Sequence, residues 1–177
     1  MTFGDLASDL GLSKSGLFAH FNSKLQLQLD VLALAAEHFT RRVFIPALKK
    51  PRGKVRLRAI FERWLDWVQS AEPARGCVFL SGAVEWADRE GPVRDTLVAW
   101  FDELYRGLGR AVSIAVDEGH FAEGLDGEQF VGELHAVVLK FHLDVRLLRK
   151  RGARARALRA FERLCRFAEA GTGSSAG

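Results

Sequence analysis

Apolar residues recur at helical spacing along most of the chain. One stripe, at intervals of three and four, consists of Leu25, Leu29, Leu32, Ala36 and Phe39. It predicts a long helix over about residues 23–44, which starts at the capping-box pattern Ser23-Lys24-Leu25-Gln26. Further stripes predict helices over about residues 54–70, 77–89, 92–119, 126–150 and 153–170. Because strand signals are nearly absent, we expect an all-α protein.

Residues that cap or end helices lie between these stripes and divide the chain into parts. Thr2 can cap a short helix over about residues 3–10, Gly11 ends it, and Ser13 can cap a second over about residues 14–20. Pro46 and the segment at 49–53 break the helical pattern and mark the best boundary. We therefore expect an N-terminal region over 1–44, a second domain over 45–170, and a flexible tail over 171–177.

Charge is unevenly distributed along the 177 residues. The net charge is +4 and the isoelectric point is near 9.4, but residues 46–70 carry +5, residues 71–130 carry −7 and residues 131–177 carry +6. A basic balance fits a nucleic-acid partner, and it fits equally an arginine-rich, solvated helix face. The acidic stretch fits a solvated face better than a site for a cationic ligand.

Location and redox state follow from what the sequence lacks. It has no apolar run of about 18 residues and no N-terminal signal peptide. Cys77 and Cys165 lie far apart and outside any zinc-ligand spacing, so we interpret both as reduced thiols. We expect a cytoplasmic protein.

No motif of enzyme chemistry is present. The sequence contains no HExxH, P-loop, GxGxxG or GxSxG pattern. Asp117 and His120 form one carboxylate–histidine pair, and His135 and His142 lie seven residues apart, which is too few groups for a metal centre. We predict that the protein is not an enzyme and holds no metal or other cofactor.

The two short N-terminal helices, joined at Gly11-Leu12-Ser13, have the pattern of a helix-turn-helix. Gly11 permits the tight turn, and the apolar residues on both sides can pack the pair at a fixed angle. The second helix then presents small and basic residues at its start, where they can approach base edges. A helical hairpin inside an ordinary bundle is the alternative interpretation.

The same segment resembles the tetracycline-repressor (TetR) family of transcriptional regulators. The resemblance rests on Thr2-Phe3-Gly4-Asp5-Leu6-Ala7, on Gly11-Leu12-Ser13-Lys14-Ser15-Gly16-Leu17-Phe18, and on His20-Phe21-Asn22-Ser23-Lys24. It implies a helix-turn-helix DNA-binding module followed by a helical ligand-binding and dimerisation domain. The expected function is a repressor that a small molecule releases from an inverted-repeat operator in double-stranded DNA.

The resemblance also implies DNA-contacting residues. They are Thr2, Ser13, Lys14, Ser15, Gly16, Leu17, Phe18, His20 and Lys24. Lys24 would reach a phosphate from the first turn of the long helix. Phe18 stands where the family usually has Tyr, so the hydroxyl contact to phosphate is lost.

One departure opens a second interpretation. The family has a helix before the position of Thr2, so we expect the natural protein to begin some 20–40 residues upstream. If that helix is absent from the natural protein, the alternative is a helical small-molecule-binding protein that has lost DNA binding.

The second domain would supply the effector site and the dimer interface. The candidate effector-binding residues are aromatic: Trp64, Trp67, Phe79, Trp86, Trp100, Phe101 and Tyr105. They would suit an apolar or aromatic effector, although an aromatic core explains each of them equally well. The candidate interface of a homodimer, on the last two helices, consists of Phe130, Leu134, Val137, Phe141, Val145, Leu158 and Phe161. The alternative is that these residues complete the core of the monomer.

Overall fold

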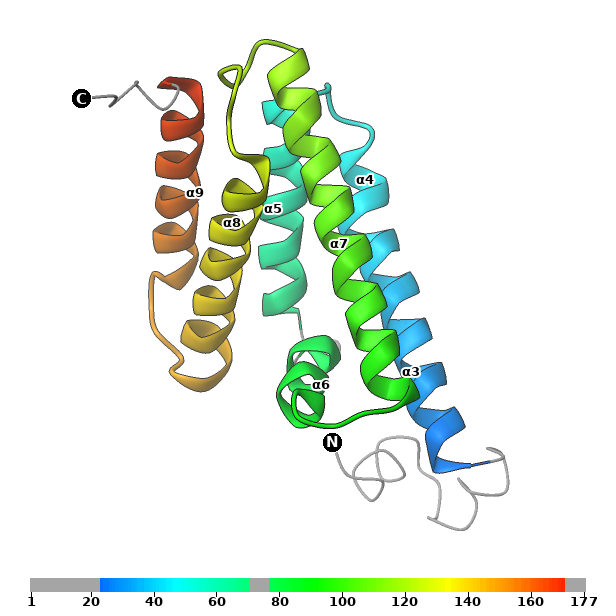
Figure 1. Ribbon diagram of the computed structural model, residues 1–177. Helices are drawn as coiled ribbons and strands as arrows, with labels where there is room; N and C mark the ends of the chain where they lie inside the picture. The colour runs from blue at the N-terminus through cyan, green and yellow to red at the C-terminus, as the bar shows by residue number, and fades with distance from the viewer. Residues whose placement is uncertain (1–22, 71–76, 171–177) are drawn as a thin grey trace, which may run out of the picture. The chain divides into compact units, whose positions relative to one another are not determined.

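The computed structural model describes residues 23–70 and 77–170, and every regular element in these ranges is a helix (Figure 1). This confirms the predicted all-α class. The main helices are α3 Lys24–Phe39, α4 Ile45–Ala47, α5 Lys54–Gln69, α6 Val78–Trp86, α7 Pro92–Asp117, α8 Gly127–His142 and α9 Ala153–Ala170. Two π-helical turns extend α3 and α8, at Thr40–Phe44 and Leu143–Leu147.

Local sequence signals account for where the helices begin. The Ser23 hydroxyl accepts the Gln26 N–H at 3.1 Å, which is one half of the predicted capping box. The Gln26 amide donates to Asp30 (2.9 Å), one turn further along α3. Asp126 caps α8 in the same way and accepts the Gln129 N–H at 2.9 Å.

The helix predicted over 23–44 does not break at Pro46. It continues to Ala47 because the backbone widens into a π-helical turn just before the proline, and the Ile45 N–H bonds to the Thr40 carbonyl five residues back. A proline ring clashes with the carbonyl four residues earlier, and the wider turn relieves that clash. The helix predicted over 126–150 likewise ends in a π-helical turn, at Leu147.

The chain forms two compact units. Unit 1 comprises Met1–His38 with Cys77–Phe101, and unit 2 comprises Phe39–Gly76 with Asp102–Gly177. Helix α7 contributes its first part to unit 1 and the remainder to unit 2. The core of unit 1, within the described residues, consists of Leu32, Phe79, Val93 and Leu97.

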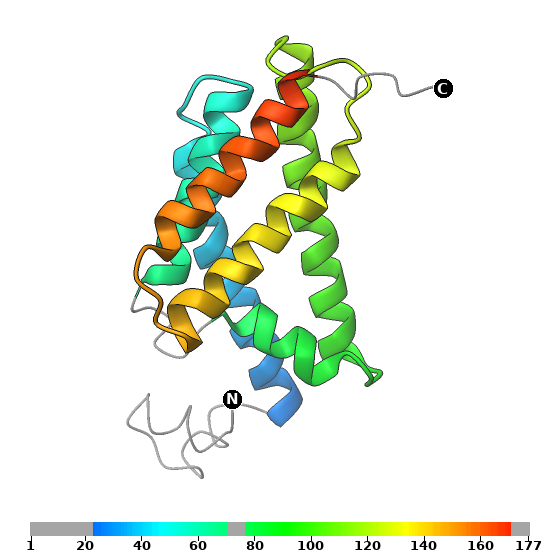
Figure 2. The same cartoon turned by 90° about the vertical axis from the view of Figure 1, so that its left-hand side faces the viewer.

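Helix α5 lies at the centre of unit 2. It contacts the π-helical turn at Thr40–Phe44 as well as α8 and α9, and α8 and α9 run side by side in opposite directions (Figures 1 and 2). The Phe61 ring of α5 stacks on Phe161 of α9, with centroids 4.4 Å apart and planes 11° from parallel. Both rings are buried, so this stack joins α9 to the core.

Replacing Phe161 by Ala should lower the free energy of unfolding by about 3–5 kcal/mol, because it removes a buried ring and leaves a cavity against Phe61. Urea denaturation measures this loss. Phe167 on the same helix is 58% exposed, so Phe167→Ala should change stability by no more than about 0.5 kcal/mol. Equal losses in the two variants would contradict the burial of Phe161 against Phe61.

Candidate functional site

In unit 2, side chains of α5 and α7 meet at His135 of α8. The Trp64 ring of α5 stacks on the imidazole, with centroids 5.4 Å apart and planes 18° from parallel. The Tyr105 hydroxyl of α7 lies 2.9 Å from His135 Nδ1. The sequence pattern pointed to Trp64 and Tyr105 but gave no reason to place His135 between them.

The environment favours neutral forms of both polar groups. Burial lowers the pKa of His135 and raises the pKa of Tyr105. A neutral imidazole can accept a hydrogen bond at Nδ1, and a protonated phenol can donate one. The pair therefore forms a hydrogen bond between two neutral groups, one half-buried and one 40% exposed, and it fixes the direction of the Tyr105 ring.

Tyr105 also lies on an open groove of about 1050 Å³ between α7 and the first turns of α8. The groove is lined by Asp102, Tyr105, Arg106 and Gly109 of α7 and by Asp126, Gly127, Glu128, Gln129, Val131 and Gly132. Apart from the adjoining residues of its own helix, no described atom lies within 4 Å of where a Cβ would stand on Gly109 or on Gly132. A small molecule could therefore approach the backbone of both helices and reach the Tyr105 hydroxyl.

The other predicted effector-binding aromatics pack in the two cores. Trp67 lies edge-on against Phe39 at 5.8 Å in unit 2. In unit 1 the Phe79 ring lies on Trp100, with centroids 3.5 Å apart and planes 2° from parallel. Of the seven aromatics, the groove in unit 2 is lined by Tyr105 alone, while Trp64 reaches it indirectly through His135.

Two more of these aromatics have defined partners in unit 1. Phe101 lies edge-on to Trp100 at 4.9 Å, and the Arg89 guanidinium lies 5.3 Å from the centre of the Trp86 ring. Trp86, Trp100 and Phe101 are half-buried and pack against the unit 1 core. The effector roles of these residues stay predictions.

The predicted dimer-interface residues divide into two groups. Four are buried within the single chain, where they complete its own core: Phe130, Leu134, Phe141 and Phe161. Their side chains have no surface left for a partner. The half-buried ones are Val137, Val145 and Leu158.

Sequence reasoning missed an exposed apolar stripe that starts at Leu139 of α8 and continues into the following π-helical turn. Leu139, Leu143 and Leu147 are 38%, 42% and 71% exposed. Their spacing of four residues was readable from the sequence, but it could not be separated from the core stripe without knowing which side of the helix is covered.

Lys24 is the one predicted DNA-contacting residue that lies within the described ranges. It is exposed in the first turn of α3, directly after the Ser23 cap. The other predicted DNA contacts lie outside the described residues, as do the two short helices predicted over 3–10 and 14–20 and the tail over 171–177: Thr2, Ser13, Lys14, Ser15, Gly16, Leu17, Phe18 and His20.

The described ranges include both cysteines of the chain. Cys77 and Cys165 form no disulfide, and burial raises the pKa of Cys165 to about 11, so the Cys165 thiol is protonated at neutral pH. Residues 23–70 and 77–170 contain no group of three or more side chains suited to a metal ion. Among the described helices, none has the length and apolar character needed to cross a membrane.

Comparison with known proteins decides the family. Residues 53–161 match the family model described as "Tetracyclin repressor-like, C-terminal domain". The chain belongs to the tetracycline-repressor family. This match runs from α5 to the middle of α9, so it is independent of the N-terminal motif and confirms the resemblance found there. Searching curated protein sequences gives no match.

Solved structures of other proteins share the fold. SCO4454, a TetR-family transcriptional regulator from Streptomyces coelicolor, is 18% identical; the alignment covers 96% of this chain and 85% of that one, with a TM-score of 0.77. AibR in complex with isovaleryl coenzyme A and operator DNA is 20% identical. The alignment covers 91% of this chain and 87% of AibR, with a TM-score of 0.67.

Acid should destabilise the protein through His135. Because its pKa is lowered in the folded state, the unfolded chain takes up the proton first as the pH falls below about 6.5. Stability should therefore drop as the pH falls below about 6.5, with a slope from this group of at most about 1.4 kcal/mol per pH unit. His135→Phe, which keeps a ring on Trp64, should make the slope shallower in urea titrations at several pH values.

The matched control is His38→Gln, because His38 is exposed on α3. It should leave the slope unchanged. His142, whose pKa burial also lowers, keeps part of the slope in both variants. An identical slope in wild type and His135→Phe would show that the Trp64–His135–Tyr105 arrangement does not exclude the charged imidazole.

Proposed function

We propose that this protein is a ligand-responsive, DNA-binding transcriptional regulator, and that it acts as a repressor released from its operator by a small molecule. The observation that carries the proposal is the TetR-family match over residues 53–161. The helix-turn-helix motif over residues 2–24 supports it independently. In this proposal residues 1–44 form the DNA-binding region with its connecting helix, and residues 45–170 bind the effector and a second copy.

The first turn of α3 suits a phosphate contact. Its backbone N–H groups and the Lys24 ammonium both offer donors, and the helix dipole adds positive potential there. Such a contact positions the protein on DNA without reading sequence. Base readout is then assigned to the recognition-helix residues from Ser13 to Leu17.

The groove beside Tyr105 is the proposed effector site. A small molecule that takes the Tyr105 hydroxyl as its own partner would compete with His135, and this would change how α7 is held against α8. Because α7 continues into unit 1, a shift of this helix can be passed along it. AibR, a structural neighbour, was solved with both isovaleryl coenzyme A and operator DNA, which supports a fold that serves both ligands.

DNA binding is tested by fluorescence-anisotropy titration of the 177-residue chain with duplexes that flank its own gene. Binding should prefer these duplexes over a scrambled one and should weaken as salt rises. Lys24→Gln should lower affinity and reduce the slope of log K against log salt by about one, because one phosphate contact is lost. The matched control Lys49→Gln removes an exposed lysine outside the motif and should leave the slope unchanged.

An absence of sequence-specific DNA binding would contradict the proposal. If neither flanking duplexes nor genome-wide fragments bind better than the scrambled duplex, the proposal of a sequence-specific regulator is wrong. A helical small-molecule-binding protein without DNA binding is then the better description.

We also infer a homodimer that pairs along the exposed stripe at the end of α8 and in the π-helical turn that follows it. Leu139, Leu143 and Leu147 place apolar side chains on one line there, and two such lines can cover each other across a two-fold axis. A dimer would present two recognition helices to an inverted repeat.

Leu143→Asp should raise the dimer dissociation constant at least about tenfold, because two carboxylates would be buried next to each other at the axis. Sedimentation equilibrium measures the constant. Val84 of α6 is 77% exposed, so Val84→Asp serves as a control of equal chemistry away from the stripe. A monomeric wild-type chain, or equal effects of the two variants, would refute this interface.

A further inference from the structure

The groove beside Tyr105 has negatively charged walls. Three carboxylates line it, from Asp102 on α7 and from Asp126 and Glu128 at the start of α8. Arg106 is the one cation among its lining residues, so three negative charges and one positive charge leave a net charge of −2. The dipole of α8 adds only about half a positive charge at its N-terminus. The potential in the groove therefore favours a cation over an anion.

The cation in the groove wall is already paired. Arg106 Nη2 lies 2.9 Å from Glu103 Oε2, and Arg106 Nε donates to the Asp102 carbonyl oxygen at 3.3 Å. Glu103 does not line the groove, so it compensates Arg106 from outside. Among the described residues, none makes a hydrogen bond or an ion pair with the Asp102 or Glu128 carboxylate. These two carboxylates, one on each wall, are therefore available to a ligand.

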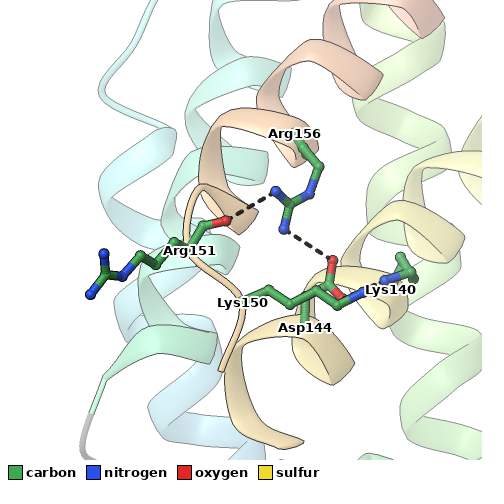
Figure 3. Close-up of polar contacts among 5 residues, drawn as sticks. All are labelled: Lys140, Asp144, Lys150, Arg151 and Arg156. Atoms are coloured by element: carbon green, nitrogen blue, oxygen red, sulfur yellow. Dashed lines mark hydrogen bonds and ion pairs between the residues drawn. The ribbon is translucent and has the colours of Figure 1, made fainter. Parts of the chain in front are cut away.

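Acidic side chains elsewhere in unit 2 are held by cations. Asp144 is 5% exposed and accepts a hydrogen bond from Lys140 Nζ at 2.5 Å. Lys150 and Arg156 lie 3.8 and 3.6 Å from its carboxylate oxygens (Figure 3). Four further carboxylates pair with Lys or Arg on α5 and α9: Glu62, Asp66, Glu162 and Glu169. These ion pairs join parts of unit 2 to one another, whereas the two available carboxylates of the groove walls have no such partner among the described residues.

A metal ion does not fit the groove. The described residues contain no group of three or more His, Cys, Asp or Glu side chains that could hold one. A calcium ion needs six or more oxygen ligands within about 2.6 Å. Carboxylates that stand apart on two helices suit a larger cation, whose charge is carried on an organic body.

The remaining walls suit an apolar or aromatic body. Tyr105 lines the groove and is 40% exposed, and an aromatic face attracts a cation placed within about 6 Å of its centre. Gly109 and Gly132 also line the groove, and their missing side chains let a slender body lie against the backbone of both helices. The volume of about 1050 Å³ is sufficient for a drug-sized molecule, since such sites span about 300–1,000 Å³.

We propose that the groove beside Tyr105 binds a small organic cation, an ammonium group carried on an apolar or aromatic body. The ammonium lies between Asp102 and Glu128, where charge-assisted hydrogen bonds are available, and the body lies along Tyr105 and the two glycines. This inference rests on the proposed function, which makes the groove the effector site, and it adds the chemical class of the effector. The acidic stretch over 71–130 favoured a solvated face from sequence alone, but folding gathers three of its carboxylates around one groove.

Binding is tested by isothermal titration calorimetry of the 177-residue chain with four compounds that share one body. 4-Phenylbutylamine and 4-phenylbutyltrimethylammonium are cations, 4-phenylbutanol is neutral and 4-phenylbutanoate is an anion. A cation should bind saturably, and comparing the two cations shows whether hydrogen bonds from the ammonium are needed. The alcohol and the anion should bind at least about tenfold more weakly, because they gain nothing from the two carboxylates.

Charge variants locate the site. Asp102→Asn and Glu128→Gln should each weaken binding of the preferred cation about threefold, because an exposed ion pair contributes little. The double variant should reduce it to the level of the alcohol. Asp117→Asn, which changes an exposed aspartate of α7 outside the groove, should leave binding unchanged.

Two further variants test the body of the ligand. Gly132→Leu places a side chain in the groove and should abolish binding, although leucine favours a helix more than glycine does. Thermal unfolding therefore separates a filled groove from a lost fold. Tyr105→Leu should weaken binding of the cation more than binding of the alcohol, whereas Tyr105→Phe, which keeps the ring, should retain the preference for the cation.

Cation binding and DNA release are measured separately, so the inference and the proposed function can fail separately. In the anisotropy assay, the preferred cation should weaken binding of the flanking duplex. Cation binding that needs Asp102 and Glu128 but leaves DNA binding unchanged supports the ligand class and contradicts the effector role. Sequence-specific DNA binding by a chain that binds neither cation overturns the inference and leaves the proposed function standing.

Two other results would overturn the inference. Equal binding of the amine and the alcohol, or cation binding that survives the double variant, would show that the carboxylates do not participate. A raised dimer dissociation constant in the double variant, together with no cation binding to the wild type, would assign these carboxylates to the contact between subunits.

Discussion

The breadth of the apolar surface of α5 is the constraint on which unit 2 depends. Seven of its sixteen residues are buried, which is more than one narrow stripe. A helix that is apolar over so wide an arc must be covered from several directions. The π-helical turn after α3, together with α8 and α9, provides that cover, and the Phe61–Phe161 and Trp64–His135 stacks each join one neighbour to it.

That packing has a consequence for chemistry. It holds a half-buried imidazole against the Trp64 ring, where a polar group without a partner is costly. The Tyr105 hydroxyl supplies the partner, and in doing so it is held at the edge of the α7–α8 groove. Tyr105 therefore has two roles. Its hydroxyl is the hydrogen-bond partner of His135, and its side chain lines the candidate effector site. Under the proposed function, an effector in this groove would therefore act on the hydrogen bond that joins α7 to α8.

The α8–α9 hairpin follows a different principle. Its core face is apolar, but its turn collects cations around one buried carboxylate, so that part of the hairpin depends on charge rather than on area. Asp144 lies in the π-helical turn, and its carbonyl accepts the Lys150 N–H at 2.8 Å across the loop. The widened turn thus brings Asp144 and Lys150 together, although local periodicity alone predicted one uninterrupted helix there.

The sequence by itself determined the all-α class, the helix starts at Ser23 and Asp126, the limits of α9 and the family, because spacing, caps and motifs are properties of neighbouring residues. It predicted that the helix would break at Pro46, where a π-helical turn instead carries it through. Only the tertiary structure decided which aromatics meet, which interface candidates are buried and where cations outnumber a carboxylate. Trp64 and His135 are seventy-one residues apart in the sequence, so their stacking contact forms only when the chain folds and cannot be predicted from a local pattern.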